Sequence, residues 1–251
     1  MCEKNRAQSE LLGFLLIFAM VVLIIALVSA TGFVGFNNAQ EYQRSANAEG
    51  AFTALASNVD DVTRRGAPSR STELRIADAS LSVENERSSV EVRLDGSKLD
   101  LGGNHETGSI VYDSGTGTTI SYRSGALIRE DDGNSLLFRE PDFVITEEEV
   151  LLPITHLSPD GTSEVGGTSG VDVWTLDSGT EVITAGTPVA DNVTIVFETP
   201  HVDAWTRYFE QFEDGGPVTK VSSDSEAGTV EVEIETDRIS VIAHRVTTRF
   251  R

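Results

Sequence analysis

The sequence predicts a mainly β protein, in which a long N-terminal helix, transmembrane and then amphipathic, precedes an antiparallel β-sandwich or rolled sheet with one inserted helix. Three observations support this prediction. An uncharged apolar stretch runs from Leu11 to Phe36, a helical spacing of apolar residues continues to about residue 65, and apolar and polar residues alternate from Glu73 onward. A period near 3.6 residues indicates a helix and a period of two indicates strands.

The apolar stretch, within the segment 8–36, predicts a membrane-crossing helix. A bilayer core of ~30 Å needs about twenty apolar residues at about 1.5 Å per residue. Lys4 and Arg6 precede the stretch, and positive charge stays on the cytoplasmic side. We therefore expect a single-pass cell-membrane protein, with the lipid bilayer as a partner, the N-terminus inside and the C-terminal domain extracellular.

Residues 37–66 continue the helix as an amphipathic stalk. Apolar residues recur there at three- and four-residue steps, which places them on one helix face; they are Tyr42, Ala46, Phe52, Leu55, Val59 and Val62. Gly66, Ala67 and Pro68 follow at once. Because glycine and then proline commonly follow the end of a helix, the stalk is expected to end there.

Residues 67–251 are expected to form the extracellular β-rich domain. Short alternating segments, for example SSVEVRLDG and TVEVEIE, are separated by turn signals. Those signals include Asp95-Gly96, Ser124-Gly125 and Asp132-Gly133-Asn134. Short strands at such spacing predict an antiparallel sheet with one solvated face.

One helix interrupts these strands between Pro200 and Phe212. Its aromatic residues Trp205, Tyr208, Phe209 and Phe212 are spaced at i, i+3, i+4 and i+7, which is one helix face. We expect this face to pack on the sheet as core. The alternative is a platform that binds a carbohydrate or a partner protein.

The charge is strongly negative, at −21, and only Lys4, Lys98 and Lys220 are lysines, against sixteen arginines. Such a balance excludes a nucleic-acid-binding surface, which needs a basic face. It leaves a cation-binding surface or adaptation to high salt. Because the acidic residues are spread along the chain, and because ~1 M salt reduces the Debye length to ~3 Å, we favour a halophilic protein.

No pattern of catalytic or metal-binding residues stands out, so we expect no enzyme activity, no catalytic or metal residues and no cofactor. The histidines His105, His156, His201 and His244 are scattered. His201 and Asp203 are two residues apart at the expected helix start, where a solvated cap is favoured over a metal site. The acidic runs 130–132 and 147–149 fit solvated surface.

The triplet Asn192-Val193-Thr194 matches the acceptor pattern for N-glycosylation. An extracellular domain would expose such a site to modification. The triplet also arises by chance and falls in an expected strand, so both interpretations stay open.

The first residues, MCEKNRAQSELLGF, place a short basic leader directly before the apolar helix. This arrangement resembles the N-terminus of archaeal type IV pilins and archaellins. The resemblance covers about the first thirty-six residues. It implies that the helix within 8–36 first holds the subunit in the membrane and then packs with identical helices in a filament core. It implies a prepilin-like leader over 1–7, removed by a prepilin peptidase between Ala7 and Gln8, with Arg6 before the cut. It also implies that Glu10 assists subunit assembly, although its third mature position differs from the fifth position of bacterial pilins. A helix-start acid favoured by the dipole is the alternative for Glu10.

The stretch AEGAFTALASNVDDVTRRGAPSRSTELRI is similar to a segment of uncharacterised haloarchaeal surface proteins with a pilin-like N-terminus. Together these observations lead to one main hypothesis. The chain is expected to be a membrane-anchored, type IV pilin-like structural protein of the cell surface of a halophile, a minor filament subunit being one form, with like subunits or other pilins as partners. The alternative is a signal-anchored surface module that binds a partner or ligand without polymerising.

Overall fold

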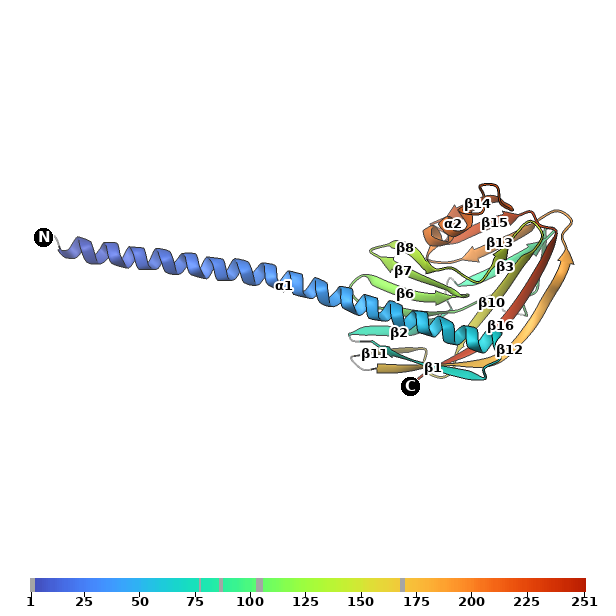
Figure 1. Ribbon diagram of the computed structural model, residues 1–251, viewed down its shortest axis with the longest axis horizontal. Coiled ribbons are helices and arrows are strands. Elements are labelled where there is room, and N and C mark those ends of the chain that lie inside the picture. Colours follow the sequence, from blue (N-terminus) through green and yellow to red (C-terminus); the bar gives the residue numbers. More distant parts are fainter. Residues whose placement is uncertain (1–2, 77, 86–87, 103–105, 168–169) are drawn as a thin grey trace. The chain divides into compact units, whose positions relative to one another are not determined.

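The computed structural model describes the backbone of residues 3–76, 78–85, 88–102, 106–167 and 170–251, and within the first helix the side chains of 13–29 and 40–64. The chain forms two compact units, residues 1–46 and 47–251. Helix α1, Glu3–Arg64, supplies the first unit and the beginning of the second. Figure 1 shows the elements in chain order.

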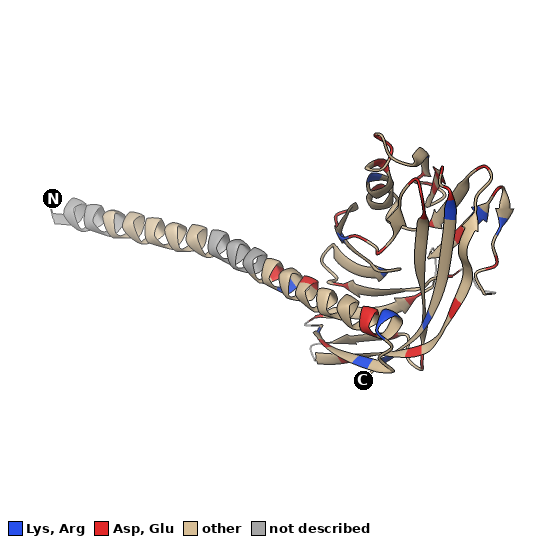
Figure 2. Ribbon diagram, turned by 45° about the vertical axis from the view of Figure 1, so that its right-hand side comes forward, with Lys and Arg blue, Asp and Glu red and all other residues tan. Residues whose placement is uncertain are grey.

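The expected membrane crossing within residues 8–36 is a prediction that the structure corrects. Within the described part of the chain, no helix is both long enough and apolar enough to cross a bilayer. The described side chains of this segment are those from Gly13 to Ser29. Figure 2 shows this part of α1 without Lys, Arg, Asp or Glu. The expected single-pass location, and the transmembrane part of the fold class, are therefore wrong.

The end of α1, residues 47–64, is a core element of the second unit. Phe52, Leu55 and Val59 are fully buried, and Val62 is 2% exposed, which is the face predicted by their spacing. Tyr42, assigned to the same face, is instead 74% exposed. The helix ends at Arg64. Gly66 then adopts a φ of 70°, a conformation that glycine adopts without strain.

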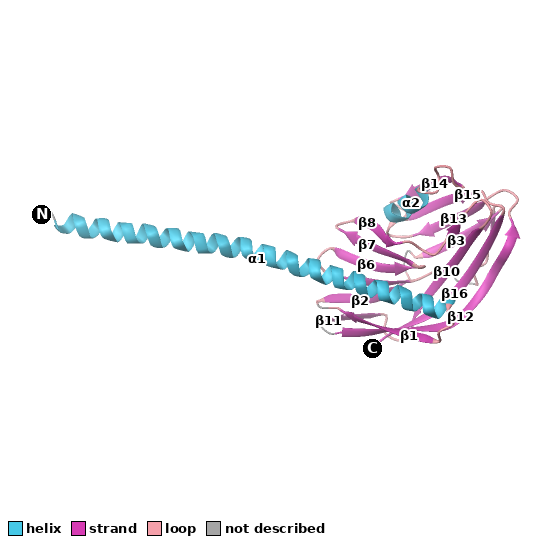
Figure 3. Ribbon diagram, viewed as in Figure 1, coloured by secondary structure: helices cyan, strands magenta, loops and turns pink. Residues whose placement is uncertain are grey.

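In the described part of the chain, sixteen strands follow α1 and form three sheets, and Figure 3 shows the strands in magenta. The first sheet has the order β1 (Ser69–Arg75), β12 (Gly170–Pro188), β16 (Arg238–Phe250), β10 (Val150–Pro159) and β9 (Val144–Ile145). The second sheet has the order β11 (Glu164–Gly167), β2 (Ala79–Glu84), β5 (Ser109–Asp113), β6 (Thr118–Arg123), β7 (Ala126–Asp131) and β8 (Asn134–Arg139). The third sheet has the order β14 (Val218–Asp224), β15 (Thr229–Ile234), β13 (Val193–Glu198), β3 (Ser89–Leu94) and β4 (Ser97–Lys98).

Two-residue turns close three of the hairpins at the predicted positions. Asp95-Gly96 joins β3 to β4, Ser124-Gly125 joins β6 to β7, and Asp132-Gly133 joins β7 to β8. Both residues of each turn have positive φ, for example 44° at Ser124 and 90° at Gly125. Such a pair of left-handed residues matches the twist of the flanking strands. The turn predictions are confirmed.

The prediction of a mainly β protein is confirmed, whereas the expected antiparallel sandwich or rolled sheet is wrong in two respects. Strands β10 and β16 pair in parallel, from Val150 with Ile239 to Pro159 with Thr248. The strands also divide among three sheets rather than the two of a sandwich. Strand β12 pairs with β16 through several register shifts between Asp177 and Thr187. Such irregularities bend a strand and increase its twist.

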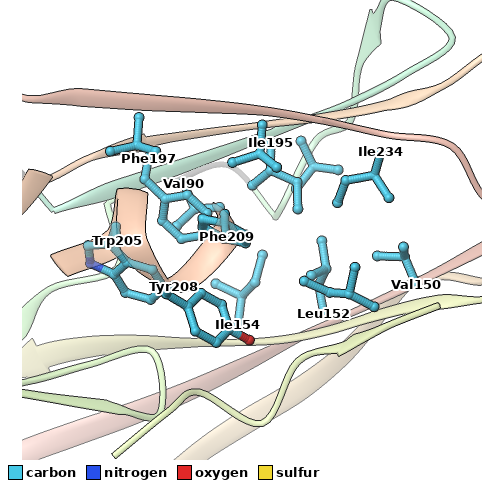
Figure 4. Close-up of a cluster of buried hydrophobic side chains, with 14 of the residues drawn as sticks. Val90, Val150, Leu152, Ile154, Ile195, Phe197, Trp205, Tyr208, Phe209 and Ile234 are labelled. Atoms are coloured by element: carbon cyan, nitrogen blue, oxygen red, sulfur yellow. The ribbon is translucent and has the colours of Figure 1, made fainter. Parts of the chain in front are cut away.

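Helix α2, Val202–Glu210, lies within the predicted range and contributes the aromatic part of the core. Trp205, Tyr208 and Phe209 are buried, and Phe212 is partly buried beside them. The Trp205 ring stacks on Phe197 of β13 with 4.6 Å between ring centroids. Figure 4 shows Trp205, Tyr208 and Phe209 beside Val90, Ile154 and Ile195 of the strands. The aromatic face is thus core and presents no exposed platform.

Candidate functional site

The residues proposed for leader processing are Arg6, Ala7 and Gln8, and the proposed assembly acid is Glu10. Their backbone lies in α1, but their side chains lie outside the described residues. Their roles therefore stay predictions.

Asn192 lies in the loop between β12 and β13, one residue before the strand rather than within it. Its carbonyl oxygen accepts a hydrogen bond from the Asp95 N–H at 3.0 Å, and the residue is half-buried. Its modification stays a prediction.

His201 directly precedes α2 and is not a solvated cap. The residue is only 5% exposed, and its side chain makes no capping hydrogen bond to the helix. Instead Nδ1 lies 2.9 Å from Oε2 of Glu130 on β7, and Nε2 lies 3.2 Å from Oγ of Ser121 on β6. Because an ionised carboxylate only accepts, Nδ1 carries the proton and donates to Glu130, and Nε2 accepts from the Ser121 hydroxyl.

This chain of hydrogen bonds has the same order as that of a serine–histidine–acid triad. A hydrolytic nucleophile must also reach its substrate. Ser121 is fully buried and lies in the middle of β6, where its backbone is paired with β5 and β7. The network therefore fixes the loop that precedes α2 against the sheet, and Ser121 offers no accessible nucleophile.

A polar cavity of about 520 Å³ lies beside this network on one face of the second sheet. Ser80, Ser82 and Glu84 of β2 contribute alternate side chains, as do Thr119 and Arg123 of β6. The intervening residues of these strands point to the other face, where Leu81, Ile120 and Tyr122 belong to the core. The period of two that builds the core thus also builds the cavity wall.

Arg123 is the most deeply placed charge in this cavity, at 4% exposed. Burial lowers the pKa of its guanidinium to about 10, although the nearby carboxylates of Glu84 and Glu130 favour the charged form. The guanidinium therefore remains protonated at neutral pH. Burial also raises the pKa of Glu130, which Arg123 partly offsets. Burial, assisted by the Arg123 charge, lowers the pKa of His201 to about 3, so the imidazole is neutral.

Sequence analysis did not find this cavity. Thr119, Ser121 and Arg123 alternate with apolar residues, a pattern that predicts a solvated strand face. Glu130 was assigned to a solvated acidic run. The one signal was His201 next to the aromatic helix, because a histidine at a buried helix start brings a polar group to a sheet face. Its hydrogen-bond partners, Glu130 and Ser121, are separated from it by 71 and 80 positions in the sequence.

Among the described residues, no group of three or more His, Cys, Asp and Glu side chains is arranged to hold a metal ion. His201 and Asp203 thus form no such group.

Neither the curated proteins nor the solved structures include a match to this chain. A family of unknown function, DUF7289, matches it over residues 6–249. This range takes in α1 from Arg6 onward, all three sheets and the cavity. The chain therefore belongs to the DUF7289 family.

Proposed function

We propose that the protein is a pilin-like structural subunit, and that the apolar part of α1 packs against the same helix of other copies. One observation carries this proposal. From Phe14 to Val28 the large apolar side chains are 47% to 71% exposed. They cover every side of the helix, since no charged residue interrupts them.

The free energy available from covering these side chains is large. Burying one large apolar side chain contributes about 1.5–3 kcal/mol. The stretch holds more than ten such side chains, so covering them is a large favourable term, from which the entropy cost of association is subtracted. A helix that is apolar on all sides needs neighbours on all sides. A bundle of identical helices supplies them, whereas a single partner helix covers only one face.

The N-terminal sequence agrees with this role. The basic leader before the helix resembles that of archaeal pilins, and we propose that a prepilin peptidase cuts between Ala7 and Gln8. Mass spectrometry of the mature protein from its own cells tests the cut. A first peptide beginning at Gln8, together with enrichment of the protein in sheared surface filaments, is the expected result.

The packing itself is tested with the full chain. Analytical ultracentrifugation in detergent-free buffer should show large assemblies for the wild type. Leu16→Glu with Leu23→Glu places two charges on one helix face and should shift the protein to monomers. Tyr42→Glu is the matched control, because Tyr42 is 74% exposed and outside the apolar stretch. A wild type that stays monomeric at micromolar concentration would overturn the proposal.

A second candidate function, a surface module that binds a ligand, is favoured by the polar cavity. Ligand binding in this cavity would not depend on whether the α1 helices assemble.

A further inference from the structure

Part of one face of the first sheet carries apolar residues from four neighbouring strands. Val182 of β12 is paired with Ile242 of β16, and Ile242 is paired with Pro153 of β10. Leu151 lies two residues before Pro153 and therefore on the same face of β10. It is paired with Val144 of β9. These five residues are called the apolar patch below.

The apolar patch is not part of the core. Leu152 and Ile154, which alternate with its residues on β10, are buried in the core on the other face of the sheet. Val182 is 60% exposed and Val144 is 44% exposed, and the other three patch residues are half-buried. Among the described residues of 47–251, Leu136 of the second sheet is the one other large apolar residue that is exposed. Contiguous exposed apolar surface is a common sign of an interaction site.

Helix α1 covers the same face of the sheet farther along the strands. Thr155 and His244 are the next residues on this face of β10 and β16, and they are 5% and 6% exposed. They line one small recess together with Asp60 and Arg64 of α1. The helix ends at Arg64, and β10, β12 and β16 continue past its end (Figure 1). The apolar patch therefore begins where the cover provided by α1 ends.

Charge favours a second copy of this chain as the partner. The five patch residues are uncharged, whereas the whole chain has a net charge of −21. Two such chains repel each other wherever their carboxylates come together, so an uncharged surface is where they approach at least cost. Aliphatic side chains on one sheet face also suit an isologous contact, in which the same surface is used by both copies.

The apolar patch is too small to hold two copies together by itself. A stable interface buries about 800 Å² on each partner, and three of the five patch residues are already half-buried. The proposed packing of α1 supplies the missing affinity, because it holds copies together at an effective concentration of about millimolar. A weak contact between patches forms at such a concentration.

We propose that the apolar patch is a contact between neighbouring copies of this chain, and that two patches meet face to face. The inference rests on the proposed assembly through α1 and names a second surface that takes part in it.

Cross-linking of the full chain tests the contact. Cys2 is the only cysteine, so Cys2→Ser gives a background for single-cysteine variants. Ile242 lies at the centre of the row formed with Val182 and Pro153, and Ile242→Cys places a thiol there. Packed sheets lie about 10 Å apart, a distance that a short bismaleimide spans. We expect at least about tenfold more cross-linked dimer than in the control, because the assembly holds the two thiols together.

Val196→Cys in the same background is the matched control. Val196 is also half-buried and lies on β13, the middle strand of the third sheet, as Ile242 lies on the middle strand of the first. Unlike Ile242, it is paired with Glu91 and Glu231. Two such faces would bring like charges together, so little dimer is expected.

Ultracentrifugation of the same samples reports assembly independently of cross-linking. Assembly without preferential cross-linking of Ile242→Cys would overturn the patch contact and leave the α1 proposal standing. Preferential cross-linking in a protein that forms no large assemblies would overturn the α1 proposal alone. A protein that neither assembles nor cross-links contradicts both.

A charge placed in the apolar patch gives a second measurement at an exposed position. Val182→Glu sets two like charges against each other across the contact and should raise the dissociation constant of the assembly at least about tenfold. Leu136→Glu is the matched control, because Leu136 is 59% exposed on the second sheet, and it should leave the constant unchanged. If Ile242→Cys fails to fold, these two variants decide: equal effects on assembly rule out the proposed contact.

Discussion

Arg139 of β8 donates a hydrogen bond from Nη2 to Oδ2 of Asp60 in α1 at 2.5 Å, across 79 residues of sequence. The two side chains are 25% and 15% exposed. Arg64 and Asp142 extend the pair into a network, since Arg64 Nη2 lies 2.5 Å from Asp142 Oδ2 and 3.4 Å from Asp60 Oδ1. The network joins the end of α1 to the edge of the second sheet.

We expect Arg139→Gln to lower the free energy of unfolding by about 1–2 kcal/mol. This lies between the ~0–1 kcal/mol of an exposed ion pair and the ~3–5 kcal/mol for breaking a buried one. Chemical denaturation measures the change. The matched control is Arg75→Gln, whose partner Glu73 lies 3.9 Å away with both side chains mostly exposed. Equal losses in the two variants would show that burial of the first pair is unimportant.

A second prediction concerns the apolar face of α1. Leu55 is fully buried between the sheets, so Leu55→Ala leaves a cavity and should cost about 2–5 kcal/mol. Leu136→Ala is the matched control, because Leu136 is 59% exposed on β8, where such a change usually costs within about 0.5 kcal/mol. Urea unfolding of both variants tests the prediction. A loss below 1 kcal/mol in Leu55→Ala would mean that α1 is not part of the core.

Local patterns predicted the elements of residues 47–251 well, because each depends on neighbouring residues. The spacing of Phe52, Leu55 and Val59 places them on one buried helix face. Asp95-Gly96 and Ser124-Gly125 each supply the two left-handed residues that a tight turn requires. The parallel pairing of β10 with β16 has no local signal. It joins residues that lie far apart in the sequence, for example Val150 and Ile239.

The candidate site was hidden for the same reason. Its position in β6 predicts an outward-facing Arg123, and the sequence does not show that Pro200 and His201 line the same cavity. The membrane prediction failed for another reason: it relied on apolar length alone, and within the described part of the chain no helix is both long and apolar enough to cross a bilayer.

A third prediction follows from His201. Its ordinary pKa of 6.5 falls to about 3 in the folded protein, mainly through burial. Between these values the unfolded chain binds a proton that the folded chain does not, so stability falls as pH decreases from about 6.5 toward 3. The loss of stability is at most about 1.4 kcal/mol per pH unit. The hydrogen bond to Glu130 makes this loss smaller, because a carboxylate favours the protonated imidazole.

Unfolding experiments across this range test the slope. His201→Gln keeps a donor and an acceptor but does not titrate, so its stability should depend less on pH than that of the wild type. His156→Gln is the matched control for removing a histidine, because Nδ1 of His156 lies 2.9 Å from the backbone carbonyl oxygen of Glu106 and not from a carboxylate. Identical slopes in wild type and His201→Gln would contradict the assigned burial of the imidazole.

The last prediction concerns salt. The net charge is −21, and four carboxylates surround one surface recess in the described structure: Glu147, Asp191, Glu235 and Asp237. In dilute buffer their repulsion destabilises the fold, and at ~1 M salt a Debye length of ~3 Å screens it. Because this screening is nearly complete by about 0.5 M NaCl, we expect the melting temperature to rise steeply up to that concentration and more slowly above it. General salting-out would instead raise the melting temperature without such saturation.

Neutralising part of the recess separates the two effects of salt. Asp191→Asn with Glu235→Gln removes two exposed charges and should raise the melting temperature at 50 mM NaCl while changing it little at 2 M. Ser222→Asn with Ser223→Gln, an exposed pair on β14, is the uncharged control. Because screening acts only on charges, a gain that persists unchanged at 2 M NaCl would assign it to local packing, and the acidic surface would then have no part in the response to salt.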